Sequence, residues 1–252
     1  MRVGIMGASG RVGLKLVEAV LADPGLELAA AFVSPQSRLL GTPVANGSIE
    51  YRVADADFRS YCDVVIDFSN PAASLQLQEI SARLALPMVI GTTGFTPAQQ
   101  ARLEGHARHR ALLISPNFAF GFEAFKLAVL QFARQTPSAD PTIIETYHIN
   151  KKAEPSGTSQ QLAALIREAR QAASTVAIET PHIVVQREAN VVGDTIVRFD
   201  MSAGEMSFRC SVQTIAAYAE GALAAARWLV ESGAQRGRFS LADTLTQPGV
   251  HS

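Results

Sequence analysis

Hydrophobic and polar positions change their spacing about halfway along the chain. In the first half, short and nearly continuous apolar runs alternate with segments in which apolar residues recur at helical spacing. The runs cover residues 3–6, 28–33, 64–68, 88–90 and 112–114, and the helical segments cover residues 11–21, 72–84 and 97–109. Continuous apolar runs are typical of strands buried on both faces of a parallel sheet. Because strands and helices alternate, we predict a doubly wound α/β domain.

After about residue 118 the pattern becomes that of a sheet with one solvent-exposed face. Extended segments here are richer in polar residues and alternate better between polar and apolar positions, which favours an antiparallel or mixed sheet. They cover residues 142–149, 182–187, 191–200 and 206–213, and helical patterns cover residues 123–134, 159–173 and 215–230. The last helix is Ala-rich and amphipathic, so we expect it to pack back on the first domain. We predict residues 1–119 plus 214–252 as one domain and residues 120–213 as an inserted α+β domain.

Composition and charge narrow the class of protein. The 252 residues are 48% hydrophobic and 18% charged with a net charge of −1. The hydrophobic residues are numerous enough to form a packed core. The near-zero net charge favours neither nucleic acid nor an anionic membrane as a partner. The apolar stretches are too short to span a bilayer, and the chain enters a strand at once, without a secretory leader pattern. We therefore expect a cytoplasmic protein.

The remaining cysteines, histidines and arginines suggest no metal site. The two cysteines, Cys62 and Cys210, are far apart and lack metal-ligand spacing, so we expect two packed thiols. His106 and His109 alternate with arginines between residues 106 and 110, and we expect this segment to form a solvated helix face.

A glycine-rich loop directly follows the first predicted strand. It reads Gly7-Ala8-Ser9-Gly10-Arg11-Val12-Gly13 and opens the first predicted helix. In a dinucleotide-binding loop the first glycine makes the tight turn, the second lets backbone N–H groups reach the pyrophosphate, and the third allows close helix–strand packing. The helix N-terminus also favours negative charge. A plain turn is the alternative, but this position favours a Rossmann-like dinucleotide site at residues 7–12.

The end of the second predicted strand bears on the choice of cofactor. A carboxylate there would bind the ribose of NAD, but the segment reads Phe32-Val33-Ser34-Pro35-Gln36-Ser37-Arg38. Ser34, Ser37 and Arg38 have the chemistry to hold a 2′-phosphate, which favours NADPH over NADH. The alternative for Arg38 is a solvated loop residue.

Several further sequence blocks occur in an order that is typical of one enzyme family. They are Asp67-Phe68-Ser69-Asn70-Pro71, Gly91-Thr92-Thr93-Gly94-Phe95, Pro116-Asn117-Phe118, Ile143-Ile144-Glu145, Glu154-Pro155-Ser156-Gly157-Thr158 and Glu220-Gly221-Ala222. With the glycine-rich loop they run over nearly the whole chain and resemble the dihydrodipicolinate reductases of lysine biosynthesis. The resemblance implies an NAD(P)H-dependent reductase of a small anionic substrate, the cyclic imine carboxylate 4-hydroxy-tetrahydrodipicolinate. It also implies a homotetramer formed through the second sheet.

The resemblance further implies which loops line the nicotinamide side of the cofactor cleft. The matching positions are Gly91, Thr92, Thr93, Ser115, Pro116, Asn117 and Phe118. The first three follow an apolar run, so they belong at the carboxyl edge of the parallel sheet, where ligands bind. An ordinary Gly/Thr turn is the alternative.

A candidate anion anchor precedes the helix predicted at residues 159–173. Ser156, Gly157 and Thr158 are suited to cap this helix and to leave backbone N–H groups for a substrate carboxylate. A cap without a ligand is the alternative, but nearby Lys151 favours an anion site. By resemblance, Lys151 donates a proton to the substrate and His148 binds the substrate.

The same region departs from the family pattern. The family has a pair of histidines just before the lysine, and the first of them is regarded as catalytic. Tyr147 occupies that position here. A phenol, with its usual pKa near 10, is a different acid from imidazole. Thr195 stands at a second histidine position, and residues 209–216 have neither the family's usual histidine nor its usual arginine in register. Three other arginines are candidates to replace the missing one: Arg187, Arg198 and Arg209.

Three hypotheses follow. The first is reduction of the family's usual dicarboxylate with Lys151 as the proton donor, which the retained His148 and Lys151 favour. The second is a paralogue that reduces another cyclic imine, with Tyr147 in its catalytic site, which the lost histidines and arginine favour. The third is a non-catalytic cofactor-binding protein, against which the retained lysine and anion anchor argue.

Overall fold

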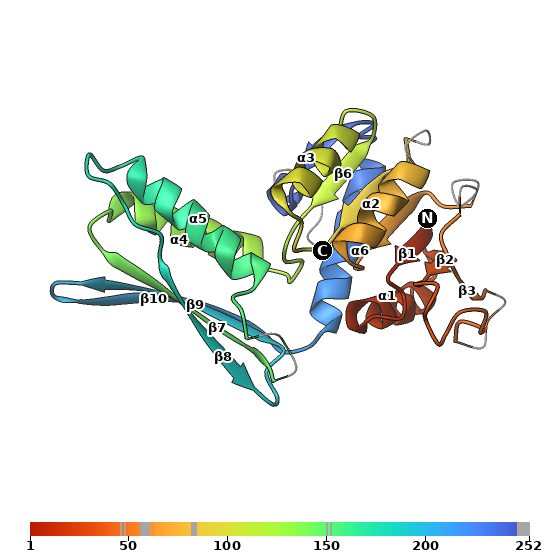
Figure 1. The fold of residues 1–252 in the computed structure, drawn as a ribbon, viewed down its shortest axis with the longest axis horizontal. Coiled ribbons are helices and arrows are strands. Elements are labelled where there is room, and N and C mark those ends of the chain that lie inside the picture. Colours follow the sequence, from red (N-terminus) through yellow and green to blue (C-terminus); the bar gives the residue numbers. More distant parts are fainter. Residues whose placement is uncertain are drawn as a thin grey trace. The chain divides into compact units, whose positions relative to one another are not determined.

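The protein is described by a computed structural model that covers residues 1–45, 47, 49–55, 61–81, 85–149, 151 and 153–245. The chain divides into two compact units, one formed by Met1–Phe118 with Ile215–Ser252 and the other by Ala119–Thr214. Each unit contains its own β-sheet (Figure 1).

The sheet of the first unit has the strand order β11-β6-β5-β4-β1-β2-β3, and every neighbouring pair is parallel. Its strands are β1 (Arg2–Met6), β2 (Glu27–Phe32), β3 (Tyr51–Arg52), β4 (Val64–Asp67), β5 (Met88–Ile90), β6 (Ala111–Ile114) and β11 (Gly237–Phe239). Its helices are α1 (Arg11–Ala22), α2 (Pro71–Ile80), α3 (Pro97–His106), α6 (Ala216–Glu231) and α7 (Leu241–Thr244). This arrangement confirms the predicted Rossmann-like doubly wound sheet.

Both faces of this sheet are buried, which explains why its strands are apolar without alternation. Val3 and Ile5 belong to the core that contains the buried residues of α1 and α6. Met6 and Val65 belong to a second core that contains the buried residues of α2 and α3. Since successive strand side chains point to opposite faces, β1, β2, β4, β5 and β6 each contribute to both cores.

Three differences from the expected elements concern two short strands and the ends of two helices. Strands β3 and β11 were not expected, because two and three residues are too few to show a periodic pattern. The helix expected at residues 72–84 ends at Ile80, and residues 82–84 lie outside the described part of the chain. The helix expected at residues 97–109 ends at His106.

The expectation of a solvated face at residues 106–110 is wrong for Arg110. Its side chain is fully buried at the start of β6 and donates hydrogen bonds to the carbonyl of Gln78 (3.0 Å) and to the hydroxyl of Ser81. Burial lowers its pKa to about 10. The contact with α2 therefore draws this arginine inward, although the preceding Arg108 and His109 are exposed.

The second unit is a four-stranded mixed sheet with the order β10-β9-β7-β8. Its strands are β7 (Asp140–His148), β8 (His182–Glu188), β9 (Gly193–Met201) and β10 (Gly204–Val212), and its helices are α4 (Phe122–Gln135) and α5 (Gly157–Gln171). Strands β7 and β8 are parallel, whereas β9 is antiparallel to both β7 and β10. Ile143 and Val197 pack with the buried residues of α4 and α5, so the neighbouring Ile144 and Ile196 point to the opposite face. The predicted mixed sheet is confirmed.

Candidate cofactor and substrate sites

The loops of the predicted cofactor site lie at one edge of the first sheet. The glycine-rich loop follows β1, Ser34 follows β2, Ser69 follows β4, Thr92 follows β5 and Ser115 follows β6. Because these strands are parallel, their carboxyl ends meet at the same edge, which is where open α/β sheets bind ligands.

The backbone of the glycine-rich loop is shaped for close approach. Gly7 has a φ of +82°, and a Cβ atom there would lie 2.4 Å from the carbonyl oxygen of Phe68. A Cβ on Gly13 would lie 2.1 Å from the carbonyl oxygen of Gly7, so only glycine lets α1 pack this close to the loop. Gly10 stands at the N-cap of α1 and has no side chain to satisfy the first-turn N–H groups. This loop therefore fits a pyrophosphate.

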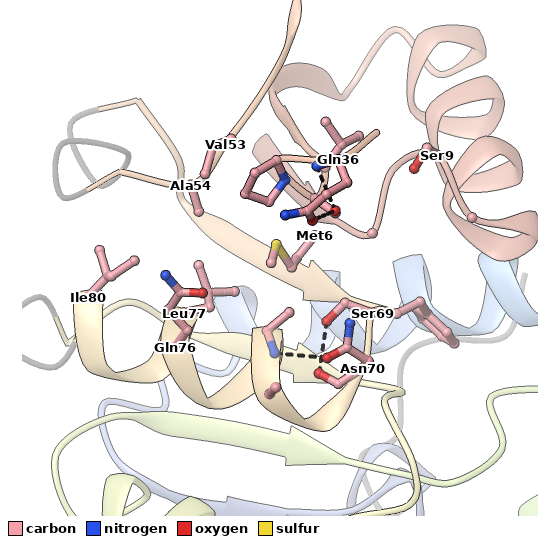
Figure 2. A pocket seen from close by; sticks show the side chains of 18 residues that line it. Met6, Ser9, Gln36, Val53, Ala54, Ser69, Asn70, Gln76, Leu77 and Ile80 are labelled. Atoms are coloured by element: carbon pink, nitrogen blue, oxygen red, sulfur yellow. Dashed lines mark hydrogen bonds between the residues drawn. The ribbon is translucent and has the colours of Figure 1, made fainter. Parts of the chain in front are cut away.

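A cavity of about 460 Å³ opens beside this loop. It is lined by Met6, Gly7, Ser9, Gly10, Val33, Ser34, Pro35, Gln36, Val53, Ala54, Phe68, Ser69, Asn70, Ala72, Ala73, Gln76, Leu77 and Ile80. Ser9, Ser69 and Asn70 lie at a polar end, while Val53, Ala54 and Ile80 lie at a mainly apolar end that also carries the amide of Gln76 (Figure 2). Among the described residues, the lining has no charged side chain. Such a cavity suits a flat, uncharged ring system at one end and a phosphate at the other.

Only some of the cofactor-binding residues predicted in the loops after β1 and β2 line the cavity. Gly7, Ser9, Gly10 and Ser34 line the cavity, whereas Ala8, Arg11 and Val12 do not. Ala8 is fully buried, and its N–H donates to the carbonyl of Phe32 at 3.0 Å. Arg38 is exposed and is not among the described residues of the lining.

Four polar lining residues were not predicted as site residues from the sequence: Gln36, Ser69, Asn70 and Gln76. Gln36 lies beside Ser34, whose hydroxyl donates to its side-chain oxygen at 2.7 Å. Asn70 caps α2 by accepting a hydrogen bond from the N–H of Ala73 at 3.0 Å. The position of Asn70 directly after an apolar strand and before Pro71 was the signal that could have identified it.

A buried carboxyl group connects the loops after β4 and β5. Asp67 is fully buried and accepts hydrogen bonds from the hydroxyls of Ser69 (2.5 Å) and Thr92 (3.1 Å). Burial raises the pKa of Asp67 above its usual value, although hydroxyl donors oppose the shift. This network fixes the buried Thr92, whereas Thr93 is exposed.

Aromatic side chains pack the loops after β4, β5 and β6 against one another. A Cβ on Gly91 would lie 2.4 Å from the ring of Phe68, which makes an edge-on contact with Phe118 at 5.6 Å between centroids. Helix α6 approaches so closely that a Cβ on Gly221 would lie 1.8 Å from the carbonyl oxygen of Phe118. Ser115 and Asn117 are buried, and the Ser115 hydroxyl donates to the Asn117 carbonyl at 2.7 Å. The predicted nicotinamide-side loops therefore form one packed assembly.

In the second unit, the predicted anion anchor is tied to a buried glutamate. Ser156 is the N-cap of α5, and its hydroxyl accepts a hydrogen bond from the N–H of Ser159 at 3.2 Å. Glu145 on β7 is fully buried and accepts hydrogen bonds from the hydroxyls of Ser156 (2.5 Å) and Ser159 (2.6 Å). Burial opposes ionisation of Glu145, but these hydrogen bonds outweigh it and lower the pKa of this carboxyl. Glu145 thus fixes the start of α5, where Gly157 and Thr158 also lie.

Tyr147 and Lys151 lie against each other at the end of β7. The ammonium nitrogen of Lys151 is 3.1 Å from the centroid of the Tyr147 ring. The turn between them is closed by the N–H of Lys151, which donates to the carbonyl of His148 at 2.9 Å. Tyr147 is 7% exposed, and its phenol lies close to the side chains of Ser156, Thr158 and Thr195. Burial raises the pKa of this phenol above its usual value.

The three arginines that were candidates to replace the family's missing one are all paired with carboxylates of the chain. Arg187 pairs with Glu145 at 3.2 Å, Arg209 with Asp194 at 2.8 Å, and Arg198 with Asp200 at 3.2 Å.

Among the described residues, no group of three His, Cys, Asp or Glu side chains is arranged to hold a metal ion. No helix in that part of the chain has both the length and the apolar character needed to cross a membrane.

The parallel sheet, the glycine cradle at a helix N-terminus and the adjoining cavity define a dinucleotide-binding protein of the Rossmann type. Comparison with known families identifies it further. Residues 1–118 match the model of the dihydrodipicolinate reductase N-terminus, and residues 121–245 match that of its C-terminus. The chain belongs to the dihydrodipicolinate reductase family and is an NAD(P)H-dependent oxidoreductase.

Individual proteins that are similar to this chain belong to the same family. The 4-hydroxy-tetrahydrodipicolinate reductases of Acinetobacter baumannii and Ralstonia nicotianae are 30% and 31% identical to the chain. Each alignment covers 97% of this chain and 96% or 99% of the relative, respectively. The dipicolinate-bound dihydrodipicolinate reductase from Paenisporosarcina sp. TG-14 has the same fold, with a TM-score of 0.72 and 21% identity over 96% of this chain and 98% of that one.

Proposed function

We propose that this reductase converts 4-hydroxy-tetrahydrodipicolinate to tetrahydrodipicolinate in lysine and diaminopimelate biosynthesis. The observation that carries the proposal is the combination of an anion anchor at the start of α5 with Lys151 on the same unit. Two relatives named for this activity, each about 30% identical over nearly the full length, support it.

Each group of residues has a distinct task in the proposed reaction. The reduced nicotinamide supplies the hydride when it is bound. The glycine-rich loop holds the pyrophosphate, and the loops at residues 91–93 and 115–118 hold the nicotinamide side. The N–H groups of Gly157 and Thr158 hold a substrate carboxylate, and His148 contacts the substrate. Lys151 holds a proton at its ammonium group and donates it to the substrate, and the 4-hydroxyl group of the substrate leaves as water, so that one hydride and one proton account for the product.

We propose NADPH as the preferred cofactor. Ser34 lies in the cavity lining at the position where NAD-specific sites carry a carboxylate, and the described lining residues include none. A 2′-phosphate therefore meets no repulsion from them, and Arg38 on the same loop supplies positive charge.

A different cyclic imine with one carboxylate is the second candidate substrate. The observation that favours it is that Arg187, Arg198 and Arg209 are all engaged by the chain's own carboxylates. Bidentate arginine contacts are hard to replace for a second carboxylate.

We further propose that four copies associate through the open face of the second sheet. Val184, Ile144 and Ile196 form a half-buried apolar row across β8, β7 and β9 on that face. Such a row is usually covered by another surface. Sedimentation of the wild-type chain and of Ile196→Glu tests this: the proposal expects a tetramer that the variant breaks, and a wild-type monomer contradicts it.

The substrate proposal is tested by turnover. Wild-type enzyme is mixed with NADPH and with substrate freshly made from pyruvate and aspartate semialdehyde by the preceding pathway enzyme. Rapid loss of NADPH absorbance and formation of tetrahydrodipicolinate are expected. Absence of turnover despite NADPH binding, together with activity on a monocarboxylate cyclic imine, would establish the second candidate instead.

A further inference from the structure

We propose that Tyr147 is a positioning residue for Lys151, with the face of its ring holding the lysine ammonium and its hydroxyl fixing the ring to the anion anchor. The inference rests on the proposed role of Lys151 as the proton donor. It gives Tyr147 a task other than the acid role expected from the sequence.

The contact between the two side chains is close and directional. The nitrogen of Lys151 lies 3.1 Å from the ring centroid, well within the range at which a cation is attracted to the negative face of an aromatic ring. The guanidinium carbon of Arg187 is 5.9 Å from the same centroid. The buried ring therefore presents its face to the positive charges at the end of β7.

The opposite end of Tyr147 lies beside the proposed substrate anchor. Its phenol is close to Ser156, the N-cap of α5, and to Thr158 in the first turn. It is also close to Thr195, which lies opposite Glu145 in the register of β7 and β9. One rigid side chain thus connects the proton donor with the groups proposed to bind the substrate carboxylate.

The same geometry argues against the phenol as an acid. Its oxygen lies among three protein side chains in a buried position, so loss of its proton would leave a poorly solvated phenolate. An ammonium on the ring face is the more accessible proton source.

Several other groups restrain or face Lys151. Its N–H donates to the His148 carbonyl at 2.9 Å, and its own carbonyl accepts from Arg187 at 3.3 Å. Arg187 and Glu145 are charged side chains of the described chain that lie nearby, and the charge of Lys151 contributes to the lowered pKa of Glu145. Lys152, the neighbouring residue, lies outside the described part of the chain.

The contact itself is tested without turnover. The chain has four lysines, Lys15, Lys126, Lys151 and Lys152, which reductive ¹³C-methylation labels while keeping their charge. The Lys151 signal, assigned with Lys151→Arg, is expected upfield of the Lys15 and Lys126 signals because of the ring current. Tyr147→Phe should keep this shift and Tyr147→Leu should abolish it. A wild-type Lys151 signal at the position of an exposed lysine would overturn the proposal.

Steady-state kinetics test whether the contact between Tyr147 and Lys151 contributes to catalysis. Tyr147→Phe should keep kcat and its pH profile, with only KM for the substrate raised. Tyr147→Leu should lower kcat roughly tenfold and move the alkaline limb of the profile to lower pH, because the ammonium loses its cation–π partner. Unchanged NADPH binding and unfolding midpoint show that the variant is folded. Equal loss of kcat in both variants would overturn the proposal in favour of a phenol acid.

The experiments can overturn the proposed substrate and the proposed role of Tyr147 independently of each other. An upfield Lys151 signal without wild-type turnover would contradict the proposed substrate and leave the ring–ammonium contact supported. If Tyr147→Leu does not fold, the retained shift and retained kcat of Tyr147→Phe still support the proposal, and their loss still overturns it.

Discussion

Arg187 on β8 donates a hydrogen bond from Nη2 to Oε1 of Glu145 on β7 at 3.2 Å, which joins two strands at the substrate site. The same guanidinium donates to the carbonyls of Lys151 (3.3 Å) and Glu154 (3.1 Å). The ion pair therefore holds the segment that carries Lys151. It also explains why Arg187 is a poor replacement for a substrate-binding arginine, since its donors are used within the chain.

Loss of Arg187 should destabilise the protein. Arg187→Leu leaves the carboxylate of Glu145 buried without its ion partner, and removing one member of such a pair costs about 3 kcal/mol. Urea unfolding measures this loss. Arg198→Leu is the matched control, because its pair with Asp200 is exposed and contributes roughly 1 kcal/mol or less. Equal losses in the two variants would contradict a structural role for the Glu145–Arg187 pair.

The buried Asp67 should make stability depend on pH in a direction opposite to that of an exposed, paired aspartate. Its pKa is raised by burial, so the folded state resists ionisation and loses stability as the pH rises above the unfolded value of about 3.9. Asp67→Asn removes this loss while keeping an acceptor for Ser69 and Thr92. We expect the variant to gain stability relative to the wild type as the pH rises above about 4 in urea unfolding.

Asp63 is the control for that experiment. Its pKa is lowered, with the hydrogen bond from Arg2 as the main cause, so its contribution is present above the unfolded pKa and is lost as the pH falls through the folded pKa. Asp63→Asn should therefore lose stability relative to the wild type as the pH rises. The same sign for both variants would refute the assigned environment of Asp67.

The glycine-rich loop should not tolerate a side chain at its turn. Gly7→Ala forces a Cβ against the Phe68 carbonyl at a positive φ, which costs roughly 1–3 kcal/mol and displaces the loop. We expect NADPH affinity to fall by more than about tenfold, which is 1.4 kcal/mol of binding free energy, in a fluorescence titration. Gly105→Ala on α3 meets nothing within 4 Å and should leave binding unchanged. Full NADPH affinity in Gly7→Ala would place the pyrophosphate elsewhere.

A carboxylate at position 34 should reverse the cofactor preference. Ser34→Asp places a negative charge in the lining of the cavity, where it repels a 2′-phosphate and can bind an unmodified ribose. KM for NADPH should rise about tenfold, while KM for NADH stays unchanged or falls. Arg38→Ala separates the contribution of that arginine from that of position 34. If Ser34→Asp raises both KM values equally, position 34 does not contact the 2′ group.

The sheet of the first unit could be predicted because its strands are buried on both faces. Continuous apolar runs such as those around Ile5 and Ile66 are typical of such strands. The glycine-rich loop could also be predicted, since the sterics that require Gly7 and Gly13 act within one strand–turn–helix unit.

Contacts between distant segments could not be predicted in the same way. Glu145 and Arg187 are 42 positions apart and meet only through the parallel register of β7 and β8. Lys151 meets the Tyr147 ring only because the chain turns at His148, and Arg110 is buried by contacts with α2. Each depends on which strands or helices become neighbours, and local spacing does not encode this.

The role of Lys151 is the central claim, and its replacement by alanine tests it most directly. With NADPH and freshly made 4-hydroxy-tetrahydrodipicolinate, Lys151→Ala should lower kcat by about 10²-fold or more, the range expected for loss of a general acid, while NADPH affinity is kept. Lys15→Ala, on an exposed part of α1, should match the wild type. Wild-type kcat in Lys151→Ala would show that another group donates the proton and would contradict the account.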